Sequence, residues 1–352
     1  MQKKIIALAI AALVSAPAFA DNANVTIYGK AYLDIESVSN DKSTLSGATR
    51  VQTNASRLGF KGKEDLGDGL SGIYQYEVQL DADGNAANGA GNGTRNTGAG
   101  LEGGFGTIIF GNWDTPFKVA HNKVELFDNT TVFSAINLIG RAGGAAGANY
   151  NTRQANDLQY WSPSLGGVKV NVSYSPDEGT ATGTAATQGK NTNRESLSAT
   201  YDVDGIFVAL GYEVRPDASV ATTTDNAVRL VARYDIGDFW LGATYENILV
   251  NTSTSANYSQ NNTELVGQYK LGTSKIALSY AVAGATSTAS TGANQVSLRY
   301  GYDLSKRTEL FAAYTALKND TAGAYGFSAG TTFGTNAGSS QSAIGTGLIV
   351  SF

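Results

Sequence analysis

One short stretch, Val25–Glu36 (VTIYGKAYLDIE), limits the folds open to this chain, because its apolar and polar residues alternate with a period of two. Successive side chains of an extended strand point to opposite faces. Ile27 and Leu33 therefore share one face, and Lys30 and Asp34 share the other. A soluble sheet would bury the apolar face in a core. The question is whether this chain does so, or whether its apolar face looks outward.

Later segments repeat the pattern with charged residues on the polar face, as in 168–175, 229–235 and 295–302. A soluble β-sandwich or a β-solenoid adhesin would also alternate, but either needs a dry interior, and burying so many charges without partners would be prohibitive. The polar face must contact water, and in an exported protein the apolar face then contacts lipid. Charged residues are only 16% of the chain, whereas soluble domains usually have about 25%.

The first twenty residues predict export. Lys3 and Lys4 precede the apolar run Ile5–Val14, and APAFA then gives a small-x-small cleavage pattern, so residues 1–20 are interpreted as a signal peptide and residues 21–352 as the mature domain. A run of ten is about half of what a membrane-spanning helix needs. Without those two lysines, 23 basic residues face 30 acidic ones, a net charge of −7 that argues against a nucleic-acid partner. The absence of cysteine excludes disulfides and thiolate metal sites.

Turn motifs recur along the chain at a long, regular interval. They are EDLGDG (64–69), EGGFG (102–106), SPSLGG (162–167), DVDG (202–205), DIGD (235–238), LGTS (271–274) and DLSKR (303–307). Five of the six intervals are 32 to 39 residues long, which accommodates two membrane-crossing strands of about ten residues and one loop. Two strands per turn and one at each end of the chain predict an all-β, sixteen-stranded antiparallel transmembrane β-barrel.

The remaining interval is 60 residues long and contains an extra segment at about 113–152. We expect this third long loop to fold into the lumen and narrow it, because a sixteen-stranded barrel otherwise encloses an open aqueous channel. Fixed charges beside such a constriction would sort solutes by charge as well as by size. The predicted acidic residues of the loop are Asp114, Glu125 and Asp128, and the predicted basic residues opposite them are Lys30, Arg57, Lys61 and Arg153.

Several segments together resemble the Gram-negative general diffusion porins. They are SRLGFKGKEDLGDGL (56–70), GFGTIIFGNWDTPF (104–117), YWSPSLGGVKVNVSY (160–174), YDLSKRTELFAAY (302–314) and the terminal Phe352. The resemblance covers essentially the whole mature chain. Arg57 matches the arginine of the second strand in that family, whereas Asn112 stands where relatives often have arginine.

The resemblance implies a homotrimer in the cell outer membrane that passes small hydrophilic solutes and ions passively and uses no cofactor. Its implied partners are outer-membrane lipid, lipopolysaccharide and the barrel-assembly machinery, for which Phe352 would belong to the terminal signal. Basic residues slightly outnumber acidic ones among the predicted lumen residues, which favours a mild anion preference.

Two other functions compete with this interpretation. An outer-membrane hydrolase would need a nucleophile and an oriented base, but the chain has a single histidine, His121, with no serine elbow, so no enzymatic activity is expected. A substrate-specific channel remains the alternative, although the aromatic residues fall mostly on the predicted lipid face.

Overall fold

The computed structural model describes residues 25–43, 47–83, 95–176, 192–327 and 334–352; the expected signal peptide lies outside these ranges. Its strands are β1 (Thr26–Asn40), β2 (Ala48–Thr53), β3 (Arg57–Gly67), β4 (Leu70–Gln79), β5 (Thr97–Gly103), β6 (Gly106–Asp114), β7 (Arg141–Ala142), β8 (Ala148–Asn149), β9 (Arg153–Trp161), β10 (Val168–Ser175), β11 (Arg194–Val203), β12 (Ile206–Pro216), β13 (Thr224–Ile236), β14 (Phe239–Ser253), β15 (Ala256–Leu271), β16 (Ser274–Ala283), β17 (Ala293–Asp303), β18 (Thr308–Asn319) and β19 (Ser340–Ser351). Two short helices complete it, α2 (Pro116–Val119) and the 3₁₀ helix η1 (Ala135–Asn137). Within the described ranges, no helix is long and apolar enough to cross a membrane.

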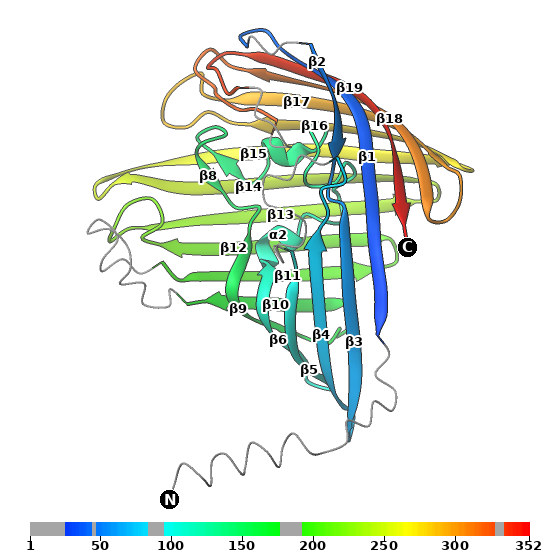
Figure 1. Cartoon of the computed structure of the whole chain (residues 1–352). Coiled ribbons are helices and arrows are strands. Elements are labelled where there is room, and N and C mark those ends of the chain that lie inside the picture. The colour runs from blue at the N-terminus through cyan, green and yellow to red at the C-terminus, as the bar shows by residue number, and fades with distance from the viewer. Residues whose placement is uncertain (1–24, 44–46, 84–94, 177–191, 328–333) are drawn as a thin grey trace, which may run out of the picture.

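The strands form one closed antiparallel barrel. β1 pairs with β19 from Lys30↔Ser351 to Asn40↔Gln341, and its other edge pairs with β2 and β3, which are two parts of one barrel strand separated by residues 54–56 (Figure 1). β7 and β8 form a separate hairpin. The barrel therefore has sixteen strands, and the predicted fold class is confirmed.

The seven predicted turns each join two neighbouring strands of the barrel. In two of them, Asp68-Gly69 and Asp204-Gly205, both residues have positive φ, between 51° and 78°. Two-residue turns of this kind match the twist of the strands they connect, which explains the Asp-Gly pairs in the sequence.

The apolar face of the sheet looks outward. In β1, Ile27 and Ile35 are 60% and 55% exposed, whereas Asp34 and Glu36 are 2% and 0% exposed. Most of the tyrosines on the strands lie on the exposed face as well. The hydrophobic effect would not leave so many aliphatic side chains in water, so the outer face is a lipid-contacting surface.

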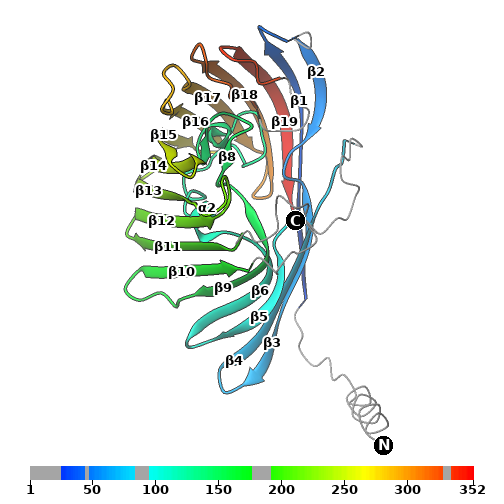
Figure 2. The same cartoon turned by 90° about the vertical axis from the view of Figure 1, so that its left-hand side faces the viewer.

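The longest connection in the described chain, residues 115–152, joins β6 to β9 and packs against the inner face of the sheet. Figure 2 shows α2 and β8 within the curve of the strands. Phe133, Leu138 and Ile139 are buried here in one cluster with inward-facing alanines such as Ala281 and Ala313. Small residues on the later strands thus make room for the apolar residues of this segment. Hydrogen bonds join the segment to β13, β15 and β17.

Candidate functional site

A buried ion pair on two adjacent strands anchors residues 115–152. Arg229 of β13 and Glu246 of β14 are both fully buried, with Nη2 and Oε2 2.8 Å apart. Arg229 also donates to the carbonyl of Phe117 and to Oδ1 of Asn151, each at 3.1 Å. One side chain thus contacts both ends of the segment. Its positive charge compensates the buried carboxylate, as a buried ion requires.

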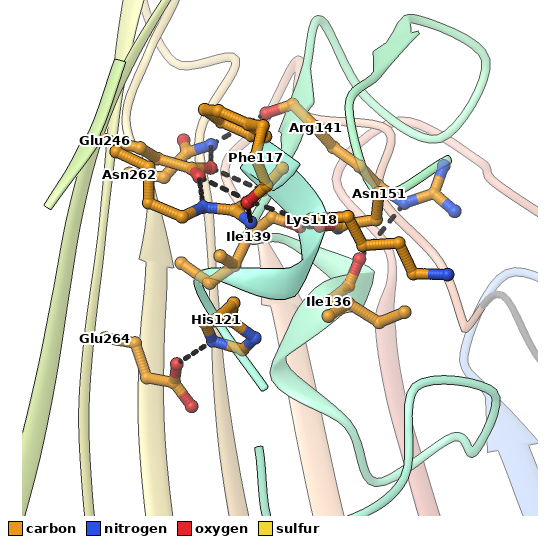
Figure 3. A network of polar contacts seen from close by, with 12 residues as sticks. Phe117, Lys118, His121, Ile136, Ile139, Arg141, Asn151, Glu246, Asn262 and Glu264 are labelled. Atoms are coloured by element: carbon orange, nitrogen blue, oxygen red, sulfur yellow. Dashed lines mark hydrogen bonds and ion pairs between the residues drawn. The ribbon is translucent and has the colours of Figure 1, made fainter. Parts of the chain in front are cut away.

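Glu246 also holds the middle of the segment. It accepts a hydrogen bond from the backbone N–H of Gly140, and another of 2.8 Å from Nδ2 of Asn262 on β15. The same amide group of Asn262 donates to the carbonyl of Arg141 at 2.8 Å (Figure 3). These bonds satisfy backbone groups that would otherwise be buried without partners.

His121 serves the same anchoring purpose. Its Nε2 lies 2.7 Å from Oε2 of Glu264, both side chains being almost fully buried (Figure 3). The other oxygen of Glu264 accepts from Ser279 Oγ at 2.9 Å. Further along the segment, Gln295 donates to the carbonyl of Val132 at 3.0 Å. The single histidine of the chain is therefore a packing residue of the segment, and its surroundings explain it without catalysis.

A cavity of about 510 Å³ lies between this segment and the inner face of β3 and β4, with the ends of β6 and β9 beside it. Its polar lining includes Arg57, Glu77, Arg95, Asn96, Asp114, Lys118, Glu125, Asp128, Asn151 and Arg153. Five of the seven residues predicted for the constriction thus lie together: Arg57, Arg153, Asp114, Glu125 and Asp128. Lys30 adjoins the cavity through an ion pair with Asp128.

Lys61 does not join this group. It lies on the same strand and the same face as Arg57, but it lines a different cavity, together with Trp113 and Trp161. Its ammonium lies 5.3 Å from the centre of the Tyr28 ring. The alternation of β3 correctly predicted that Lys61 faces the lumen, but it could not predict which cavity Lys61 lines.

Two carboxylates in the 510 Å³ cavity are each shared by two cations. Asp114 lies 2.7 Å from Lys118 Nζ and 3.1 Å from Arg153 Nη2. Glu77 pairs with Arg95 and lies 3.7 Å from Nε of Arg57, the looser of its two contacts. In these two clusters four cationic side chains therefore surround two carboxylates.

Glu125 differs from the other acids of the cavity because both of its oxygens accept hydrogen bonds from its own segment. The donors are the backbone N–H of Phe127 and Oγ of Ser134, each at 2.7 Å. Burial raises the pKa of Glu125 to about 7; His121 opposes this shift and Glu264 adds to it. At neutral pH its negative charge is consequently only partly present.

Two cations of the cavity, Arg95 and Lys118, were not among the predicted residues. Lys118 lies one helical turn after Asp114 in α2, which begins at an N-cap Thr115 followed by proline. The Asp-Thr-Pro-x-Lys spacing was a signal that could have identified it. Arg95 precedes β5 in a glycine-rich connection, where no periodicity applies.

Sixteen antiparallel strands with an apolar exterior, enclosing a cavity lined by charged side chains, define a channel-forming outer-membrane β-barrel. Residues 7–322 match the family model described as Gram-negative porin. The chain belongs to the Gram-negative porin family. It is an outer-membrane channel for the passive diffusion of small hydrophilic solutes, and the members of this family are channels rather than enzymes.

Known relatives of this family align with the chain over most of their length. Outer membrane porin protein 32 of Delftia acidovorans is 28% identical over 354 residues, 99% of each chain. Major outer membrane protein P.IB of Neisseria lactamica is 28% identical over 322 residues, which cover 88% of this chain and 91% of that protein. Among solved structures, an anion-selective porin from Comamonas acidovorans superimposes with a TM-score of 0.81 at 24% identity, covering 94% of this chain and 100% of the other.

Proposed function

We propose that residues 115–152 narrow the water-filled lumen, that the 510 Å³ cavity is the passage that remains, and that this passage prefers anions. Its charges carry the proposal. Within the described ranges, the cations at this cavity are Lys30, Arg57, Arg95, Lys118 and Arg153, and the carboxylates are Glu77, Asp114, Asp128 and the partly neutral Glu125. A net positive charge in a narrow, poorly screened slot raises the local concentration of anions. The solved relative described as anion-selective supports this assignment.

The zero-current potential of the reconstituted channel in a potassium chloride gradient tests the preference. We expect the sign that indicates chloride permeation. Arg57→Gln should reduce the potential, because Arg57 has the loosest ion pair of the cavity. Lys306→Gln removes an equal charge from an exposed turn between β17 and β18 and should leave it unchanged. A potential of the opposite sign in the unmodified channel would refute the anion preference.

We also propose that three such chains form a homotrimer embedded in outer-membrane lipid and lipopolysaccharide. A solved OmpT of Vibrio cholerae, 15% identical with a TM-score of 0.66, is described as a trimer form. Heat-resistant oligomers of three subunits in detergent would support this assembly, and a monomer under the same conditions would contradict it.

Export and assembly complete the proposal: cleavage of residues 1–20 precedes insertion, and Phe352 contributes to recognition by the barrel-assembly machinery. Phe352 lies at the barrel closure, where its backbone exchanges two 3.0 Å hydrogen bonds with Gly29. N-terminal sequencing of the mature protein should begin at Asp21. Deletion of Phe352 should lower the amount assembled, and an unchanged amount would remove this role.

A further inference from the structure

A second hollow in the inner face contains two of the three tryptophans of the chain, although most exposed aromatic residues lie on the outer face. Trp113 and Trp161 lie with ring centres 5.4 Å apart and their planes tilted by 52°. They line a cavity of about 540 Å³ together with Lys61, Lys63, Ile73, Glu102 and Ile109. A volume of this size is within the range of small-molecule sites.

The strand register explains the hollow. Ile73, Gly100 and Ile109 are neighbours across β4, β5 and β6 and share the inner face. Gly100 has no side chain, so the two isoleucines flank a flat strip of backbone. Trp161 is fixed beside it, because its Nε1–H donates to Oε1 of the buried Gln159 at 2.8 Å. The result is a rigid apolar surface with indole rings at its edge.

The charges around this surface are not balanced. Lys63 and Glu102 form an ion pair of 2.5 Å and neutralise each other. Among the residues that the structure describes, Lys61 has no carboxylate within ion-pair distance, and its ammonium lies over the neutral ring of Tyr28. A single uncompensated cation therefore stands beside a patch that favours planar rings.

We propose that this hollow, between β3, β6 and β9, binds aromatic monocarboxylates. The ring stacks on Trp113 and Trp161, and the carboxylate forms a charge-assisted hydrogen bond with Lys61. The inference rests on the proposed function in one respect, that solutes enter the lumen. It goes beyond that function because general diffusion requires no such site.

Indole fluorescence tests the site directly in detergent. The third tryptophan, Trp240, is buried beneath the guanidinium of Arg233, 4.0 Å from its ring centre, so a Trp240→Phe background leaves only the two indoles of the hollow. Benzoate should change their emission saturably. Benzamide, which lacks the charge, and cyclohexanecarboxylate, which lacks the aromatic ring, should each bind at least about threefold more weakly.

Two matched lysine variants separate the site from a general charge effect. In the same background, Lys61→Met should weaken benzoate binding about three- to tenfold and leave benzamide binding unchanged. Lys270→Met removes an exposed inward-facing lysine of β15, outside the hollow, and should change neither. Trp113→Phe keeps a stacking ring and should retain binding, with Trp161 as the reporter.

Equal binding of benzoate and cyclohexanecarboxylate, an equal effect of both lysine variants, or no saturable signal would each overturn the proposal. Conductance in potassium chloride alone, measured on the same preparations, tests the channel independently. Saturable benzoate binding that depends on Lys61 in a protein without conductance would contradict the proposed function and support the site. Conductance without benzoate binding would support the proposed function and overturn the site.

Discussion

Arg229→Met should release residues 115–152 from the barrel while leaving the barrel intact. The substitution removes the three hydrogen bonds that Arg229 makes to Glu246, Phe117 and Asn151. It also leaves the carboxylate of Glu246 buried without its cation. Breaking a buried pair in this way costs about 3–5 kcal/mol. The population with a detached segment should rise roughly 150- to 5,000-fold, because each 1.4 kcal/mol is a factor of ten.

Limited trypsin digestion of the detergent-solubilised protein measures that population. Arg141 lies in the middle of the segment, and its cleavage rate follows the open population when closing is fast. Arg307→Met, in the turn after β17, is the matched control, because it removes an arginine that does not contact the segment. Arg229→Met channels should also show fluctuating single-channel currents.

The double variant Arg229→Met, Glu246→Gln separates two effects of losing Arg229: the loss of its hydrogen bonds to the segment, and the burial of Glu246 without a cation. The amide removes the unpaired charge, so the double variant should be cleaved more slowly than Arg229→Met alone. If Arg229→Met resists trypsin as well as the unmodified protein and the Arg307→Met control do, the assignment of Arg229 as an anchor is refuted.

Three further predictions concern the charges and the outer face. Raising the pH through about 7 should ionise Glu125, add a negative charge to the cavity and lower the anion preference. The zero-current potential of Glu125→Gln should not change with pH in this range. If the potentials of the variant and the unmodified channel change equally with pH, the assignment of Glu125 is contradicted. Asp114→Asn removes the carboxylate shared by Lys118 and Arg153, so the same potential should shift further toward chloride, and a shift toward potassium would count against it. Leu210→Lys places a charge at a half-exposed outer position of β12 and should destabilise the barrel in vesicles by about 2–4 kcal/mol in urea titrations; an unchanged midpoint would contradict a lipid-facing Leu210.

The barrel could be predicted from the sequence because the alternation within each strand shows which side chains share a face. Alternation depends only on the period of two, so a single strand such as β1 already separates a polar face from an apolar one, and the charges repeated on the polar faces of later strands indicate that those faces contact water. The turn motifs are equally local, since Asp-Gly pairs adopt the positive φ that a two-residue turn requires. Neither inference needs knowledge of distant contacts.

The lining of the 510 Å³ cavity could be predicted only in part, because it depends on where residues 115–152 pack. Arg57 and Lys61 share a face of β3 but are about 13 Å apart along the strand, and of the two only Arg57 lines the 510 Å³ cavity. Glu125 was predicted as an acidic residue of the constriction, and the sequence did not indicate that both of its oxygens accept hydrogen bonds from its own segment. Such distinctions arise from tertiary packing, which no local pattern encodes.

The pairing of β1 with β19 makes the first and last strands direct neighbours. A chain that lacks β19 is an open sheet with two unpaired edges, and in hydrocarbon the amide and carbonyl groups of those edges would be costly to leave unsatisfied. Incomplete chains are thereby disfavoured from entering the bilayer. The pairing of β1 with β19 thus makes membrane entry depend on the last strand, since the cylinder closes only when that strand is present.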